Sequence, residues 1–248
     1  MTTTELSGDP ALFARECGGA GAVVRAPGGL VGAALEVGAT TWVSGPSPEW
    51  FVALDPEVTG RRWELLAVRD ALDVLDAGPA FVKLPDAKVR GFPAQVHARP
   101  DTLREAAATL RDPERVRLLV TTELFAIESE YRVFARAGAA LAVSPYLVEG
   151  EPWTPLLHTH RASFHGDALA FVADVLSALG PDEVPPAAAI DVARLADGHL
   201  VVLEANQAWA AGLYGCDADE VLTAILAAND PGAPGPGDRW RWTPDAGT

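Results

Sequence analysis

The sequence predicts an α+β protein built from two lobes that share a cleft. Its 248 residues are enough for one large domain or for two lobes with buried cores. Strand-like and helix-like apolar patterns alternate along the chain, and several strand candidates are adjacent hairpin arms, which adds antiparallel character. Apolar residues make up 49% of the chain and charged residues 21%, so we expect most of it to fold.

The first third of the chain predicts small strands, a linker and one helix. Short apolar runs broken by turn residues occupy residues 20–45, and a Pro-rich linker follows at 45–49. Apolar residues recur at helical spacing from Trp63 to Leu75 and stop at Gly78-Pro79, which predicts a helix. A strand is expected at 80–84.

The rest of the chain continues the alternation. The expected elements are helices at 101–111 (with Asp101 as N-cap), 168–179 and 217–228, a strand at 117–122, and two strand arms around Gly138 within 130–146. After residue 231 the tail is rich in Pro and Gly, so we expect it to be extended or mobile. Trp240 and Trp242 in this tail are exposed-aromatic candidates for a homodimer contact.

The charge balance limits the class of ligand. Thirty-four acidic side chains against 19 basic ones give a net charge of −15, which repels nucleic-acid backbones over most of the surface. A small anionic ligand is still compatible with this charge if a few Lys and Arg side chains converge on one cleft. The positions of the scarce cations therefore become the main question.

Cysteine usage and hydropathy predict a cytoplasmic protein. Cys17 and Cys216 are the only cysteines and form no C-x-x-C pair, so the chain has neither a disulfide framework nor a four-thiolate zinc site. No apolar stretch reaches the length of a membrane span, and the N-terminal residues lack the pattern of a signal peptide. We expect no membrane partner.

A hairpin near the C-terminal end brings three oxygen-bearing side chains together. The dipeptide Asp197-Gly198 between two apolar arms is typical of a two-residue turn. With that turn Asp191 lies opposite Glu204, and strand alternation puts Asn206 on the same face as Glu204. Two facing carboxylates repel each other unless a cation lies between them, and an oxygen-only set suits Mg²⁺ or Mn²⁺.

A plainer interpretation of the same hairpin is that Asp191 and Glu204 lie at a solvated sheet edge and that Asn206 caps the next turn. The arms, however, are apolar on both faces, which indicates a covered sheet where an unpaired charge is costly. The metal site is therefore the favoured hypothesis.

Two further clusters contain charged residues in strand-like surroundings. Lys83 interrupts an apolar strand, so its side chain either extends out of the core or reaches a buried anion such as phosphate. Lys88 and Arg90 follow in a loop that is either a solvated turn or a lid over phosphates. Further on, Arg132 lies beside acidic residues including Glu130, an arrangement that by itself is most often a structural ion pair.

Taken in chain order, these clusters resemble the ATP-grasp superfamily. The matching residues are Lys83 with Lys88, Glu123, Glu130-Tyr131-Arg132, Asp191, and Glu204-Ala205-Asn206. The resemblance spans about residues 80–227 and implies an ATP-grasp fold, with two α+β lobes around an ATP cleft. It also implies a small α/β pre-grasp domain at 1–79, the ATP-grasp domain at 80–230 and a tail at 231–248.

The resemblance implies roles for individual residues. Lys83 and Lys88 would contact the ATP phosphates, Glu123 would lie where the hinge between the lobes meets adenine and ribose, and Glu130 would also belong to the nucleotide site. Arg132 would face the transferred phosphoryl group, which with Lys88 makes it a catalytic candidate. The magnesium ligands would be Asp191, Glu204 and Asn206.

The implied activity is that of a carboxylate–amine ligase. Such enzymes phosphorylate a carboxylate with ATP, and an amine then displaces phosphate from the acyl phosphate, which yields an amide bond, ADP and phosphate. The expected partners are thus a small carboxylate and a small amine. Two alternatives stay open: a non-catalytic nucleotide-binding or regulatory module, and a zinc hydrolase that uses His158, His160 and His165.

Overall fold

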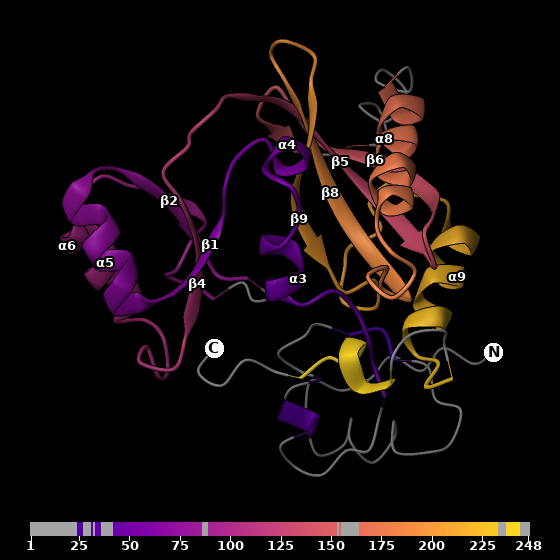
Figure 1. The fold of residues 1–248 in the computed structure, drawn as a ribbon, viewed down its shortest axis with the longest axis horizontal. Helices are drawn as coiled ribbons and strands as arrows, with labels where there is room; N and C mark the ends of the chain where they lie inside the picture. The colour runs from indigo at the N-terminus through magenta and orange to yellow at the C-terminus, as the bar shows by residue number, and fades with distance from the viewer. Residues whose placement is uncertain are drawn as a thin grey trace.

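The computed structural model describes residues 24–26, 31, 33–35, 42–85, 89–152, 154, 164–232 and 237–243. Within these residues the chain forms two lobes, each built on an antiparallel sheet with helices packed against it (Figure 1). The predicted α+β class is confirmed. None of the helices in this part of the chain is both long enough and apolar enough to cross a membrane.

The small lobe is a four-stranded sheet covered on one face by two helices. Its strands in sheet order are β1 (Glu64–Ala67), β4 (Arg117–Thr121), β2 (Ala80–Lys83) and β3 (Gln95–His97), and its helices are α5 (Val68–Ala77) and α6 (Pro100–Ala107). Both helices lie on the outer side of the lobe (Figure 1). Leu75 of α5 and Leu103 of α6 share a core with Val82 and Val120 of the sheet. Leu119 instead belongs to a core that includes residues of the other lobe.

The helix predicted from Trp63 to Leu75 is a strand followed by a helix. Residues Glu64–Ala67 pair with β4, and α5 begins only at Val68. Apolar residues Trp63 and Leu65 fit a period of two as well as a helical period, and the backbone hydrogen bonds available from β4 decide the outcome. The expected domain boundary after residue 79 therefore falls between α5 and β2, inside the small lobe.

Both ends of α6 also differ from the prediction. Asp101 is not the N-cap, because Pro100 occupies the first helical turn and Arg99 precedes it as the cap residue. Asp101 instead pairs with Arg104 one turn along, with an Nη1 to Oδ1 distance of 2.7 Å. The helix ends at Ala107, before the predicted end at residue 111.

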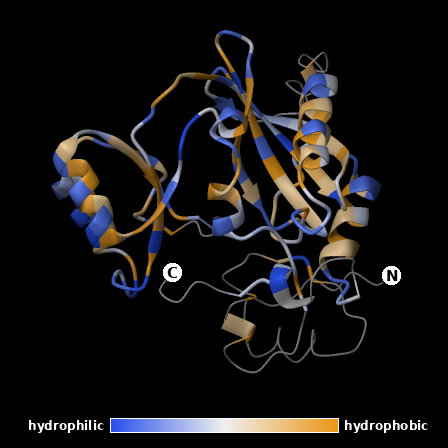
Figure 2. Cartoon of the chain, in the orientation of Figure 1, coloured by the Kyte–Doolittle hydropathy of each residue, from blue (hydrophilic) through white to orange (hydrophobic). Residues whose placement is uncertain are grey.

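The large lobe is a five-stranded sheet with a helix in each of two cores. In sheet order the strands are β7 (Glu151–Pro152), β6 (Ala139–Val148), β5 (Ile127–Arg136), β8 (Ala187–Leu195) and β9 (Leu200–Asn206), and the helices are α8 (His165–Ala178) and α9 (Ala218–Ala228). Val172 of α8 packs with Ile190, whereas Ile225 of α9 packs with Ala189. Strand β8 is thus covered on both faces, and Figure 2 shows its mainly apolar colouring.

The turn between β8 and β9 is longer by one residue than predicted. The Leu195 amide donates to the His199 carbonyl, so residues 196–198 form the turn. Within the turn, the Gly198 amide donates to the Leu195 carbonyl. Gly198 has a φ of 88°, a left-handed conformation that glycine adopts without strain. This is the three-residue type of hairpin turn rather than the two-residue type.

A bulge in β9 compensates for the longer turn. Val192 pairs with Val202, but the next pair toward the strand end joins Asp191 and Glu204, so Leu203 is an extra residue. The predicted opposition of Asp191 and Glu204 is therefore confirmed, although the predicted turn is wrong.

Two neighbouring linkers connect the small lobe to the rest of the molecule. The chain enters it after α3 (Pro48–Val52) and α4 (Pro56–Thr59), and it leaves through residues 122–126 between β4 and β5. Gly60, at the end of α4, has a φ of 67°, and a Cβ atom there would lie 2.6 Å from Val201 of β9.

The linker predicted at residues 45–49 is in part helical. It contains the start of α3, whose first turn is capped by the Ser47 hydroxyl.

The described part of the C-terminal tail packs onto the molecule. Residues Gly237–Trp240 form a short 3₁₀ helix, and the Trp242 amide donates to the Val43 carbonyl. Trp240 is buried against Trp50, and Trp242 packs edge-on against Trp209. The expectation of an extended or mobile tail with exposed tryptophans is wrong for these residues.

Candidate functional site

The two lobes meet at an ion pair between Lys83 of β2 and Glu204 of β9. The Lys83 Nζ atom lies 2.6 Å from Glu204 Oε2 and 3.5 Å from the carbonyl oxygen of Leu203, the bulge residue. Burial alone would raise the pKa of Glu204, but the Lys83 charge and the hydrogen bonds of Glu204 to Asp191, Lys83 and Asn206 together outweigh burial and hold that pKa well below its ordinary value. Lys83 thus reaches an anion, as one of its two interpretations predicted, and the anion here is the carboxylate of the facing lobe.

A second ion pair, between Arg132 of β5 and Asp191 of β8, lies next to the first. Arg132 Nε and Nη2 donate to the two Asp191 oxygens at 2.8 and 2.7 Å, a bidentate arrangement. Asp191 is 0% exposed, so its placement at a solvated edge is wrong. Burial raises the pKa of Asp191 to about 7 although the Arg132 charge opposes the shift, and that carboxylate in turn keeps the pKa of Arg132 above its ordinary value.

Asn206 joins the two acids into one cluster. Its side-chain nitrogen donates to Glu204 Oε1 at 2.9 Å and lies 3.5 Å from Asp191 Oδ2. The predicted convergence of Asp191, Glu204 and Asn206 is therefore present. In the described residues no three His, Cys, Asp or Glu side chains form a metal-binding group, so the amide is needed to complete this one.

The donor set of this cluster fits a hard divalent cation. Two carboxylates and an amide supply oxygen ligands. Asp191 Oδ2 accepts from both Arg132 and Asn206, and Asp191 Oδ1 and the two Glu204 oxygens keep a lone pair for an ion. Lys83 and Arg132 supply the positive charge that the paired acids require in this structure. Asp191, Glu204 and Asn206 would hold the ion, with the Asn206 amide turned so that its oxygen points inward.

Glu130 lies at the edge of this cluster and is held by a tyrosine. The Tyr146 hydroxyl donates to Glu130 Oε2, and burial raises the pKa of Glu130 while the nearby Glu204 charge adds to the shift. Arg132 pairs with Asp191 rather than with Glu130, so the simple interpretation of a structural ion pair along one strand is wrong. Burial and the charge of Asp191 raise the pKa of Tyr146 as well.

The loop after β9 covers Arg132 with an aromatic pair. The Arg132 guanidinium lies 5.1 Å from the ring of Tyr214 and 5.5 Å from that of Tyr146, and the two rings stack with centroids 5.2 Å apart. Arg132 Nη1 donates to the Gly212 carbonyl, and the Gly215 amide donates to the Ser144 hydroxyl, so the loop is fixed on both sides of Tyr214.

Sequence reasoning singled out neither Tyr146 nor the contact between the loop and Arg132. Tyr214 has a φ of 49°, which is rare for a bulky residue and visible only in the structure. Tyr146 lies on β6, the neighbour of the strand that carries Glu130. The pairing of β5 with β6 shifts register between Glu130 and Tyr131, and this shift brings the two side chains together. A strand-pairing model of this hairpin is the one sequence signal that could have found it.

The remaining predicted nucleotide contacts lie apart from the acidic cluster or outside the described residues. Glu123 stands in the linker between the lobes, where its Oε2 accepts a hydrogen bond from the Arg62 amide at 3.1 Å. Arg90 is exposed in a turn closed by the bridge between Val89 and Phe92. Lys88 lies outside the described residues.

The histidines of the zinc hypothesis are only partly described. His158 and His160 lie outside the described residues. His165 begins α8, and its ring packs edge-on against Tyr131 at a centroid distance of 6.2 Å.

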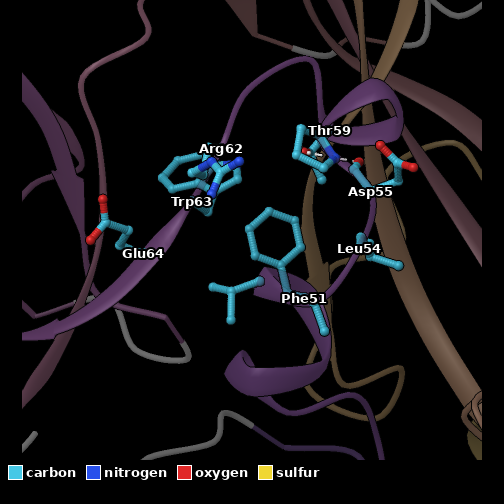
Figure 3. A pocket seen from close by; sticks show the side chains of 10 residues that line it. Phe51, Leu54, Asp55, Thr59, Arg62, Trp63 and Glu64 are labelled. Carbon is cyan, nitrogen blue, oxygen red and sulfur yellow. Dashed lines mark hydrogen bonds between the residues drawn. The ribbon is translucent and has the colours of Figure 1, made fainter.

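A pocket of about 680 Å³ opens between the α3–α4 segment and the start of β1 (Figure 3). The rings of Phe51 and Trp63 form an aromatic wall of this pocket, and Asp55 and Arg62 bring charges to its rim. The Lys83 ammonium lies 5.7 Å from the Phe51 ring and 5.6 Å from the Trp63 ring. The same two rings therefore border both the pocket and the Lys83 side of the ion pair.

Comparison with known proteins places this arrangement in a family. The model of an ATP-grasp domain, family 2 of the R-2-K clade, matches residues 59–224, which includes β1 to β9 and most of α9. No curated protein matches the chain.

Similar solved structures are distant in sequence. C-terminally truncated Cdc123 from Schizosaccharomyces pombe aligns with a TM-score of 0.45 at 9% identity and covers 64% of this chain and 81% of its own. The ATP-grasp ligase PsnB, complexed with minimal precursor, Mg and ADP, gives 0.36 at 16% identity over 68% of this chain and 53% of its own. D-alanine-D-alanine ligase from Coxiella burnetii aligns with a TM-score of 0.38 at 12% identity, over 69% of this chain and 52% of the ligase chain.

Proposed function

The chain belongs to the ATP-grasp domain family, in family 2 of the R-2-K clade, and on this premise we propose that it is an ATP-dependent carboxylate–amine ligase. The reaction would phosphorylate a small carboxylate and pass its acyl group to a small amine, with release of ADP and phosphate. The proposal includes ATP, with Mg²⁺ or Mn²⁺, as what the cleft binds.

One observation carries the proposal: a cation of the small lobe and an acidic cluster of the large lobe meet across the cleft. Lys83 contacts Glu204, and Glu204, Asn206 and Asp191 are joined by hydrogen bonds to one another and to Arg132. In a chain with a net charge of −15, two buried cations at one acidic cluster are a costly arrangement to keep for stability alone. Phosphoryl transfer needs this combination of cations and metal-binding oxygens.

We infer that Lys83 changes partner when nucleotide enters. In the structure, Lys83 neutralises Glu204. With a triphosphate in the cleft, the Lys83 ammonium would turn to the phosphate oxygens, and Glu204 would be released to the divalent ion beside Asp191 and Asn206. The ion would neutralise phosphate charge and so assist departure of the leaving group.

Arg132 and the loop over it would serve the transferred group. Its guanidinium is held by Asp191, by the Gly212 carbonyl and by two tyrosine rings, so its orientation is fixed before substrate binds. A preorganised cation stabilises developing charge at a smaller cost than a mobile one. Closure of the lobes would exclude water, which otherwise hydrolyses an acyl phosphate.

The test is an ADP-release screen with Mg²⁺ and ATP against pools of amino acids, other small carboxylates and amines, followed by mass analysis of the product. ADP release that depends on both a carboxylate and an amine, with a product of their summed mass less one water, supports the ligase. ATP binding without ADP release from any pool would contradict it and would favour the non-catalytic nucleotide-binding module.

A further inference from the structure

The Lys83 ammonium is flanked by two aromatic rings that also line a pocket. Its Nζ atom lies 5.7 Å from the ring of Phe51 and 5.6 Å from that of Trp63, and the two rings are 5.6 Å apart. Lys83 is 6% exposed, Phe51 2% and Trp63 5%. At this exposure, an incoming phosphate needs a neighbouring group to move before it can bind the ammonium.

The Phe51 ring has room to turn, whereas the Trp63 ring is packed on its other sides. The Arg61 guanidinium lies 4.4 Å from the Trp63 ring, and the Phe81 ring packs edge-on against it at 6.0 Å. Within the described residues, Phe51 contacts no aromatic ring other than that of Trp63. Beside it lies the pocket of about 680 Å³ between the α3–α4 segment and the start of β1, with the Phe51 ring in its wall (Figure 3).

The backbone that carries Phe51 is anchored. The neighbouring Trp50 donates from Nε1 to the Glu183 carbonyl at 2.7 Å and packs edge-on against Trp240. The Phe51 amide itself donates to the Ser47 carbonyl at 3.2 Å. Movement at Phe51 is therefore a rotation of its side chain to another rotamer rather than a displacement of α3.

The Phe51 ring also favours the ion pair that occupies Lys83. The ammonium donates to Glu204 Oε2 at 2.6 Å and to the Leu203 carbonyl at 3.5 Å. Two opposite charges attract more strongly where water is excluded, and an apolar ring beside them excludes water. Turning the ring away would admit water and ligand and so weaken the hold of Glu204 on Lys83.

We propose that Phe51 is a gate over Lys83, which turns into the adjacent pocket and so opens the ammonium to the phosphates of a nucleotide. The inference rests on the proposed ATP binding and adds control of access to it. The open arrangement is a minor state, and the apparent affinity for a ligand is reduced by the fraction of molecules in that state. A protein without the ring would therefore bind ATP more tightly than the wild type.

The first test measures access to Lys83 and needs no nucleotide. The chain has two lysines, Lys83 and Lys88, and a protease that cuts before Asp86 separates them, so mass spectrometry follows each during acetylation by sulfo-N-hydroxysuccinimidyl acetate. We expect Phe51→Ala to raise the acetylation rate of Lys83 at least about tenfold, because a minor state of at most about one tenth is replaced by permanent access. The control Phe171→Ala makes the same truncation on α8 against the same core, and its rate should stay within about twofold of the wild type.

A pocket-filling variant tests where the ring goes. Ala53 lines the pocket and is exposed, so Ala53→Trp places an indole in the space that the turned ring would occupy. We expect acetylation of Lys83 to be at least about threefold slower than in the wild type. An unchanged rate in this variant would overturn the pocket as the open position of the gate.

The second test is titration calorimetry with ATP and Mg²⁺. We expect Phe51→Ala to bind ATP at least about tenfold more tightly than the wild type, and Phe171→Ala to stay within about twofold. A ring that only supports the fold would leave the affinity unchanged or lower it on removal, and either result would overturn the gate.

The outcomes separate the gate from the proposed function. No ATP binding by the wild type or by any variant would refute the proposed ATP site and leave the gate without its ligand. Wild-type ATP binding combined with unchanged acetylation of Lys83 in Phe51→Ala, or with equal acceleration in Phe171→Ala, would overturn the gate and leave the ligase proposal standing. If Phe51→Ala fails to fold by circular dichroism, Phe51→Leu keeps an apolar side chain without the ring, and we expect changes in the same directions.

Discussion

The Lys83 ammonium and the Glu204 carboxylate approach to 2.6 Å across the two lobes. Lys83 stands at the end of β2 in the small lobe, and Glu204 directly follows the bulge at Leu203 in β9. The bulge also exposes the Leu203 carbonyl to the same ammonium at 3.5 Å. An irregularity of one strand thus shapes the point at which the lobes touch.

Glu204→Gln is expected to abolish the proposed ligase turnover while the chain stays folded. The amide keeps the size of the side chain but removes the negative charge that a divalent ion needs, so ADP release should fall at least about a hundredfold. The control is Glu128→Gln, whose carboxylate pairs with Arg194 away from the cluster. Turnover by Glu204→Gln close to that of the wild type would remove Glu204 from the metal site.

Lys83→Gln is expected to reduce the thermal stabilisation that ATP and Mg²⁺ confer. The variant loses the small-lobe cation next to the acidic cluster, and a charge-assisted contact to phosphate is worth enough for at least about a tenfold loss of affinity. Differential scanning fluorimetry over a range of ATP concentrations measures the shift. An unchanged ATP-dependent shift in melting temperature would exclude Lys83 from the nucleotide site.

Asp191→Ala is expected to destabilise the protein by about 3–5 kcal/mol, because it leaves the Arg132 charge buried without its carboxylate. Urea unfolding measures this cost. The comparison is Arg194→Ala, which breaks a partly exposed pair and should cost less than about 1 kcal/mol. Equal costs for both variants would show that burial does not govern the Arg132–Asp191 pair.

The small lobe is expected to lose stability as the pH falls below about 6.5, the ordinary pKa of histidine. His97 is buried on β3, and burial lowers its pKa, so below that pH the unfolded chain takes up a proton that the folded chain does not. The free energy of unfolding should therefore fall by up to about 1.4 kcal/mol per pH unit from this group. The urea unfolding midpoint is measured about one pH unit above and about one pH unit below the ordinary histidine pKa. The two midpoints should differ less for His97→Gln than for wild type. Equal differences in the two proteins would exclude His97 as the cause.

Much of the large lobe could be predicted because its signals are local. Apolar arms around Gly138 and around Asp197-Gly198 mark both hairpins, and the carboxylates stand out against apolar neighbours. The match of the family model and the two lobes confirm the predicted ATP-grasp fold. The opposition of Asp191 and Glu204 was nevertheless obtained from a wrong turn, because the bulge at Leu203 offsets the extra turn residue.

The parts that sequence reasoning missed depend on contacts between distant segments. Strand β1 could not be told from a helix because its partner β4 lies far along the chain, with Glu64 opposite Val120. Phe51 becomes notable only when Lys83 is folded against it. The metal roles of Asp191, Glu204 and Asn206 and the phosphate roles of Lys83 and Lys88 stay predictions.

The direct pairing of Glu64 with Val120 means that the small lobe starts and finishes at one spot. A variant in which the small lobe is deleted needs only a short glycine–serine linker to join the two cut ends. The excised fragment would carry Lys83, and the remainder would keep Glu204, with which Lys83 pairs. Mixing the two pieces, with nucleotide and without, would turn closure of the cleft into an ordinary association equilibrium.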